Sequence, residues 1–197
     1  MEWLLSRSRI AVFAALSAGL MAPAAASGPV DSPVVVLETN KGVMTAELLP
    51  LEAAKTVEHI LDLVDAGFYD GLIFHRVIEG FVAQTGGHVV DMSYRDAPRT
   101  VVNESENGVK NLQYTLAMAR ATHPDSAGAQ FYINLKDNPF LDYRPGQPGY
   151  TVFGKLIDGM DVAEEIGRAE TTAADVPVEP IVILRAYRRE GDKPDTP

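Results

Sequence analysis

Short runs of β-branched and aromatic residues, separated by turn residues, dominate the chain after residue 33. The runs 34–39 and 43–48 flank the turn residues Asn40-Lys41-Gly42, a pattern typical of a β-hairpin. Six more runs share this strand character, so the pattern predicts eight strands in all; the six are residues 72–78, 81–85, 115–119, 130–135, 150–156 and 181–188.

Two segments follow a helical period instead. One begins at Pro50, since proline is favoured in a first helical turn, and runs to Gly67, a typical helix stop; its apolar residues are Ala53, Val57, Ile60, Leu61 and Val64. A shorter helix is predicted over residues 160–167. Many short strands, two helices and no dividing linker predict one mainly β domain over residues 34–188, a closed antiparallel eight-stranded barrel capped by the two helices.

The first 26 residues have a different pattern, that of a secretory signal peptide. Arg7 and Arg9 precede a short apolar run, and Ala24-x-Ala26 supplies small residues for cleavage before Ser27. An uncleaved membrane anchor is the alternative, but about 13 apolar residues fall short of the roughly 20 needed to span a bilayer. We expect residues 27–33 to be a flexible lead and residues 189–197 a disordered tail.

Composition narrows the chemistry. A net charge of −10 argues against a nucleic-acid partner, which usually requires a basic face. The absence of cysteine excludes disulfides and thiol nucleophiles. The four histidines are scattered without an i,i+4 pair, so no zinc motif is present, and no G-x-S-x-G motif indicates a hydrolase.

Residues 74–87, reading FHRVIEGFVAQTGG, carry the most distinctive chemistry. Their alternation predicts two strands joined at Glu79-Gly80, which brings Arg76 and Gln84 close together beside the ring of Phe81. A cation, an amide and an apolar wall suit a ligand that is part apolar ring and part peptide amide, such as a prolyl peptide. Taken alone, Arg76 is better explained as a surface arginine whose stem lies over an apolar patch.

Further segments occur in a fixed order after this stretch: TLAMAR at 115–120, AQFYI at 129–133, NPFLD at 138–142 and YTVFGK at 150–155. Together with residues 74–87 they resemble the cyclophilin family of peptidyl-prolyl cis-trans isomerases, over essentially all of residues 34–188. The pattern is most similar to the periplasmic cyclophilins of Gram-negative bacteria.

The resemblance implies a role for each matching residue. It implies that Arg76 and Gln84 are catalytic. It implies that the substrate contacts are Phe81, Val82, Ala119, Arg120, Gln130, Tyr132, Phe140, Leu141 and Tyr150.

Several of these positions depart from the family pattern. Arg120 stands for an asparagine, Phe140 for a tryptophan and Tyr150 for a histidine, and all three also occur in the bacterial branch. Phe140 implies weak cyclosporin binding. Tyr132, for a phenylalanine, brings a hydroxyl to an apolar floor, where a buried hydroxyl requires a hydrogen-bond partner. Val82 replaces a methionine and shortens one pocket wall, and Thr85 replaces a glycine.

The resemblance therefore implies an isomerase that accelerates rotation about X-Pro bonds in exported proteins, without a metal or cofactor. The alternative is a non-enzymatic chaperone module on the same fold that binds proline segments. We expect a periplasmic monomer whose partners are proline-containing segments of folding proteins, with no nucleic acid and, after signal cleavage, no membrane.

Overall fold

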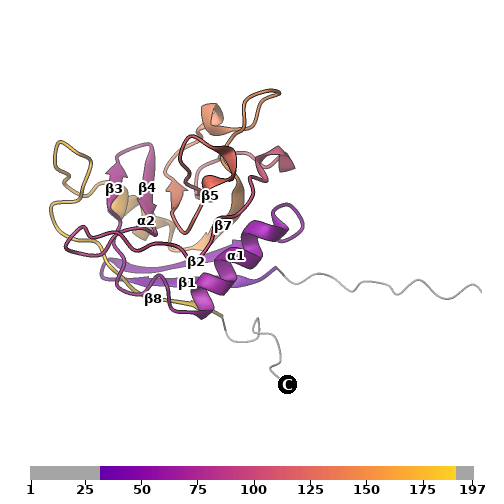
Figure 1. Cartoon of the computed structure of the whole chain (residues 1–197). Coiled ribbons are helices and arrows are strands. Elements are labelled where there is room, and N and C mark those ends of the chain that lie inside the picture. Colours follow the sequence, from indigo (N-terminus) through magenta and orange to yellow (C-terminus); the bar gives the residue numbers. More distant parts are fainter. Residues whose placement is uncertain (1–31, 190–197) are drawn as a thin grey trace, which may run out of the picture. The chain divides into compact units, whose positions relative to one another are not determined.

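The computed structural model describes residues 32–189, and within them it contains eight strands and two α-helices (Figure 1). The signal peptide, most of the lead and most of the tail predicted above lie outside these residues. The elements are β1 (Val34–Thr39), β2 (Gly42–Leu48), α1 (Ala54–Asp65), β3 (Arg76–Ile78), β4 (Val82–Thr85), β5 (Thr115–Met118), β6 (Phe131–Asn134), β7 (Val152–Asp158), α2 (Met160–Gly167) and β8 (Ile183–Arg188).

All eight strands form one antiparallel sheet in the order β3-β4-β6-β5-β7-β2-β1-β8. The predicted mainly β architecture with two helices is confirmed. The sheet curls, but β3 and β8 do not pair along a full ladder. Instead the Phe74 N–H donates to the Ile181 carbonyl (2.9 Å) and the Ile183 N–H to the Leu72 carbonyl (2.8 Å), so a few loop bonds join the two ends of the sheet.

The prediction of one strand over residues 72–78 is therefore wrong in extent, because only Arg76–Ile78 pair with β4. The backbone of Ile73 bonds elsewhere: it forms an isolated bridge with Val182, and its N–H donates to the His88 carbonyl at 2.9 Å. Residues 72–74 therefore bond to residues 181–183 and to His88 instead of continuing the hairpin with β4.

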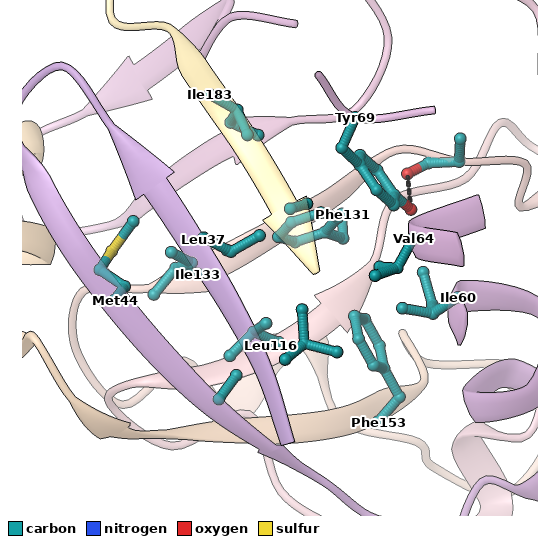
Figure 2. Packing of buried hydrophobic residues seen from close by; sticks show 14 of the residues in the cluster. Leu37, Met44, Ile60, Val64, Tyr69, Leu116, Phe131, Ile133, Phe153 and Ile183 are labelled. Atoms are coloured by element: carbon teal, nitrogen blue, oxygen red, sulfur yellow. Dashed lines mark hydrogen bonds between the residues drawn. The ribbon is translucent and has the colours of Figure 1, made fainter. Parts of the chain in front are cut away.

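The apolar core fills the inside of the curled sheet. Leu37, Leu116, Phe131 and Ile183 meet there beside the apolar face of α1 (Figure 2). Successive side chains along a strand point to opposite faces of the sheet, so every second side chain of β2 enters this core. The core also encloses Tyr69, whose hydroxyl donates to the Ala129 carbonyl at 3.0 Å; burial raises the pKa of this phenol.

Helix α2 covers the predicted residues, whereas α1 begins at Ala54 and not at Pro50. The segment before α1 forms a turn, in which the Ala53 N–H donates to the Leu49 carbonyl at 2.9 Å. No side chain at the N-cap closes the helix. Instead the Glu104 carboxylate accepts hydrogen bonds from the Thr56 N–H (2.8 Å), the Thr56 hydroxyl (2.7 Å) and the Lys55 N–H (3.2 Å).

His75 lies inside the molecule and is 8% exposed. Its ring lies 4.4 Å, between centroids, from that of His88, and the Nδ1 atoms of both rings are buried without a hydrogen-bond partner. Burial, followed by the proximity of His88, lowers the pKa of His75 to about 4. The ring is therefore neutral at neutral pH.

No helix within residues 32–189 is long and apolar enough to cross a membrane.

Replacing the distant cap of α1 tests whether it stabilises the fold. Glu104→Ala is expected to lower the free energy of unfolding by about 1–2 kcal/mol, because it leaves N–H groups of the first helical turn without an acceptor. The control is Glu58→Ala, an exposed glutamate on the same helix, expected to stay within about 0.5 kcal/mol of the wild type. Urea denaturation at pH 7 measures both, and equal losses would contradict the capping role.

The buried histidine predicts a specific loss of stability in acid. Its folded pKa of about 4 lies below the ordinary value of 6.5, so between these values the unfolded chain binds the extra proton and stability falls as pH falls. Between pH 7 and pH 4, the free energy of unfolding of His75→Gln is expected to fall by roughly 2–3 kcal/mol less than that of the wild type. Urea denaturation at both pH values measures this difference. His123→Gln, at an exposed histidine, serves as the control and should follow the wild type; an unchanged slope in His75→Gln would refute the assignment.

Candidate active site

Strands β3 and β4 form the hairpin that the sequence predicted, and it places Arg76 directly opposite Gln84. The Arg76 Nη1 donates to the Gln84 Oε1 at 3.5 Å, and the guanidinium carbon lies 6.0 Å from the centre of the Phe81 ring. The expected proximity of cation, amide and ring is therefore confirmed. Gln84 continues the chain of polar groups, since its Nε2 donates to the Gln130 Oε1 at 2.8 Å.

A residue far along the chain, Asp175, also contacts Arg76. Its carboxylate lies 3.8 Å from the Arg76 Nε, and its carbonyl accepts from the Val77 N–H at 2.8 Å. Both charged side chains are more than a third exposed, so the pair adds little to stability. It does orient the guanidinium. The surrounding sequence gave no signal for this contact, because Asp175 lies in a loop between α2 and β8.

An open cavity of about 230 Å³ lies beside this hairpin, hereafter the Arg76 cavity. Every site residue that the resemblance implied contributes to its lining except Gln130 and Phe140. Gln130 lines an adjoining hollow of about 310 Å³ that shares Gln84, Ala119 and Arg120 with the Arg76 cavity. The structure therefore brings together residues from β3, β4 and β6 and from the segments that follow β5 and precede β7.

The apolar walls of the Arg76 cavity form a cluster separate from the barrel core. Val82, Ala117, Tyr132 and Val152 are its buried members, and Phe81 and Leu141 pack against it. Val82 and Tyr132 alternate along their strands with residues of the main core. The two faces of the same strands therefore build two different apolar surfaces.

Tyr132 forms the floor of the cavity and is 4% exposed. Its hydroxyl donates to the Asn111 Oδ1 at 3.0 Å, which supplies the partner that a buried hydroxyl requires. Burial, followed by the neighbouring Tyr150, raises the pKa of Tyr132, so the hydroxyl keeps its proton. Asn111 was not predicted as part of the site, since it belongs to none of the recognised motifs.

Arg120 lines the Arg76 cavity and also holds a neighbouring loop. Its guanidinium donates to the carbonyls of Pro148 (2.8 Å) and Gly149 (3.2 Å), and lies 4.7 Å from the centre of the Tyr150 ring. The side chain therefore holds the loop before β7 against the cavity. The Ala119 N–H donates to the Gln130 carbonyl at 2.9 Å. The backbone group that Ala119 can offer to a bound peptide is therefore its own carbonyl.

Phe140 and Leu141 lie in a short turn, η3 (Pro139–Leu141), at the edge of the cavity. Phe140 is 58% exposed and its ring stacks on that of Phe81, with centroids 5.6 Å apart. Thr85, the position where the family has glycine, is fully buried, and its hydroxyl donates to the Ile73 carbonyl at 2.9 Å. The backbone at Thr85 therefore accommodates a side chain.

Residues 32–189 contain no group of three or more histidines and carboxylates placed to hold a metal ion. The polar side chains that line the Arg76 cavity are the guanidinium groups of Arg76 and Arg120, the Gln84 amide and the hydroxyls of Tyr132 and Tyr150, and this lining includes no serine, threonine, cysteine or lysine. Such a site suits the stabilisation of a conformation better than the making or breaking of a bond.

Comparison with known proteins identifies relatives of the whole domain. A family model described as "Cyclophilin type peptidyl-prolyl cis-trans isomerase/CLD" matches residues 34–188. The chain is 46% identical to peptidyl-prolyl cis-trans isomerase cyp18 of Streptomyces antibioticus over 159 residues, which cover 77% of this chain and 96% of that protein. It is 42% identical to peptidyl-prolyl cis-trans isomerase A of Dickeya dadantii over 180 residues, covering 89% and 94% of the two chains.

Solved structures of cyclophilin-type isomerases also superpose on this chain. A cyclophilin-type isomerase of Cryptosporidium parvum superposes with a TM-score of 0.70 at 26% identity, covering 81% of this chain and 99% of that one. The same protein crystallised in the presence of the dipeptide Ala-Pro gives a TM-score of 0.69 at 27% identity, covering 80% and 99%. The chain belongs to the cyclophilin-type peptidyl-prolyl cis-trans isomerases, and its activity is the cis-trans isomerisation of prolyl peptide bonds.

Proposed function

We propose that the Arg76 cavity binds a proline ring of a peptide and that Arg76 promotes rotation of the bond before it. The observation that carries this proposal is the cross-strand pair of Arg76 and Gln84 in the lining of a cavity whose apolar walls include Phe81, Tyr132 and Leu141. The crystal structure of the Cryptosporidium parvum relative with Ala-Pro supports a proline-containing ligand. The proline ring would then face the apolar walls of the cavity, and the amide before it would face Arg76 and Gln84.

The chemistry requires no covalent step. Rotation about a peptide bond is opposed by about 18–20 kcal/mol, because the nitrogen lone pair is delocalised into the carbonyl group. X-Pro bonds populate both isomers yet exchange in tens to hundreds of seconds. A catalyst must bind the twisted amide more tightly than either planar form.

Each group of the site has a place in this mechanism. Phe81, Tyr132 and Leu141 hold the proline ring, while the carbonyl before it turns. Arg76, always charged and rich in donors, donates a hydrogen bond toward the twisted amide, and Gln84 orients its guanidinium. An acceleration of about 10⁵ requires roughly 7 kcal/mol of preferential transition-state binding. A few charge-assisted hydrogen bonds at roughly 1.5–3 kcal/mol each supply that amount.

We further propose that the protein acts after export, as a periplasmic monomer on prolyl bonds of other exported chains. The support is the pattern of residues 1–26: a positive start, a short apolar run and small residues before Ser27. Slow X-Pro exchange limits the folding of many chains, so an exported isomerase would assist folding there.

Removing the guanidinium tests the catalytic role of Arg76. Arg76→Ala is expected to lower kcat/KM by at least about tenfold, since it deletes a charge-assisted donor worth roughly 1.5–3 kcal/mol. Arg185→Ala removes an exposed arginine on β8 and should leave the rate unchanged. A protease-coupled or NMR-exchange assay on an Ala-Pro peptide measures both. Equal rates in wild type and Arg76→Ala would refute the mechanism, and peptide binding without exchange in the wild type would indicate the binding module instead.

The predicted export signal is tested by mass spectrometry of the protein secreted into the periplasm of a Gram-negative host. The mature chain is expected to begin at Ser27. Ala26→Leu should block cleavage, because the residue before the cut must be small, whereas Ala25→Leu, at the unrestricted position between, should be processed normally. An exported protein that keeps Met1 would contradict the cleavable signal.

A further inference from the structure

Below the floor of the Arg76 cavity lies Asn111, a side chain that belongs to none of the motifs. It is 1% exposed. Its Oδ1 accepts hydrogen bonds from the Tyr132 hydroxyl (3.0 Å) and from the Asn134 Nδ2 (3.3 Å). The position of the cavity floor is therefore fixed by Asn111.

The donor groups of the same residue hold the edge of the cavity. The Asn111 N–H (2.8 Å) and its Nδ2 (3.1 Å) both donate to the Asp142 Oδ1. Asp142 directly follows η3, which carries Phe140 and Leu141, and its side chain is only 10% exposed. Hydrogen bonds to a charged acceptor are among the stronger ones in proteins. Asn111 therefore ties the edge to the floor.

The third wall is connected through Asn138. The Asn138 N–H donates to the Asn111 carbonyl at 2.8 Å, and its Nδ2 donates to the Phe81 carbonyl at 3.1 Å. The Leu141 N–H in turn donates to the Asn138 carbonyl at 3.0 Å. Phe81, Tyr132 and Leu141 come from separate segments, and all three are connected to Asn111 directly or through one neighbour.

We propose that Asn111 is a positioning residue for the isomerisation: it fixes the spacing of the Phe81, Tyr132 and Leu141 walls around the proline ring. The proposal rests on the proposed function of the Arg76 cavity. Apolar contacts are not directional and do not by themselves set the spacing of three separate segments, whereas hydrogen bonds have defined geometry. A ring held loosely would turn with the amide, and the binding energy would no longer favour the twisted state.

The first experiment removes the hydrogen bonds that hold η3 at the edge of the cavity and leaves the wall residues Phe81, Tyr132 and Leu141 unchanged. Asp142→Ala removes the acceptor of Asn111 and is expected to lower kcat/KM about fivefold and to weaken the binding of an Ala-Pro peptide, followed by NMR titration. Asp142→Asn keeps an acceptor oxygen and should recover most of the loss. The matched control is Lys110→Ala: its ammonium lies 3.7 Å from the same carboxylate but is 55% exposed, so its removal should change neither quantity.

The second experiment uses pH to restore the missing donor. In Asn111→Asp the introduced carboxyl faces Asp142, and burial and the like charge raise its pKa. At pH 8.5 two carboxylates repel, whereas near pH 6 the protonated group donates to Asp142 and accepts from Tyr132, as the amide does. The kcat/KM of the variant relative to wild type is expected to rise about tenfold over this range. Within residues 32–189, the charged and titratable groups around this position are Asp142 with Lys110 beyond it, and Tyr132, which keeps its proton and whose own neighbours are Tyr150 and Arg120.

A purely structural role makes different predictions. Rates are compared at a temperature where circular dichroism shows every variant folded, so a loss of stability alone leaves kcat/KM unchanged. Folded Asp142→Ala with wild-type kcat/KM and affinity, or with a loss equal to that of Lys110→Ala, overturns the proposal. If Asp142→Ala does not fold, the pH series of Asn111→Asp decides, and a flat ratio overturns it.

The result is separable from the proposed function. An inactive wild type, or wild-type rates in Arg76→Ala, would refute the mechanism at Arg76. In that case the affinity for the peptide still tests the spacing of the cavity walls, because binding requires no turnover. Loss of activity in Arg76→Ala together with an unaffected Asp142→Ala would refute the role of Asn111 alone.

Discussion

The strict alternation of side chains along β4, β5 and β6 is the constraint on which both the fold and the site depend. Ala83, Leu116 and Ile133 face the barrel core, and their neighbours Val82, Ala117 and Tyr132 form the second apolar cluster under the Arg76 cavity. A slip of one residue in any of these strands would exchange the two sets. The packing of the core therefore fixes the register, and the register presents the cavity.

The site combines this apolar framework with polar groups that are held from outside the strands. Asp175 reaches Arg76 from the loop before β8, Arg120 holds the loop that carries Tyr150, and Asn111 supports the floor. Catalysis of a rotation requires walls that stay still while one group turns. Hydrogen bonds such as those of the buried Asn111 supply that rigidity better than apolar contacts alone, because their geometry is directional.

Some elements were predictable from local pattern and others were not. Helix α2 and the hairpin of Arg76 and Gln84 agree with the sequence pattern, since both depend on neighbours within a few residues. The start of α1 and the extent of β3 were predicted wrongly. In both cases distant groups compete for the backbone: the Glu104 carboxylate caps α1, and the segment 181–183 takes the hydrogen bonds of residues 72–74.

The strand and helix periods of the sequence determined the mainly β architecture, because periodicity is a local property of the chain. The residues that line the Arg76 cavity were identified from the sequence through the resemblance of its ordered motifs to the cyclophilin family. The tertiary structure alone revealed Asn111 as the partner of Tyr132, Asp175 as the partner of Arg76 and the loop before β7 as the partner of Arg120. The physical reason is that each of these polar groups has a partner on a segment that only the fold brings near. Those partners lie between 21 and 99 residues away along the chain, Asn111 and Tyr132 being the nearest pair and Arg76 and Asp175 the most distant, beyond the reach of any local pattern.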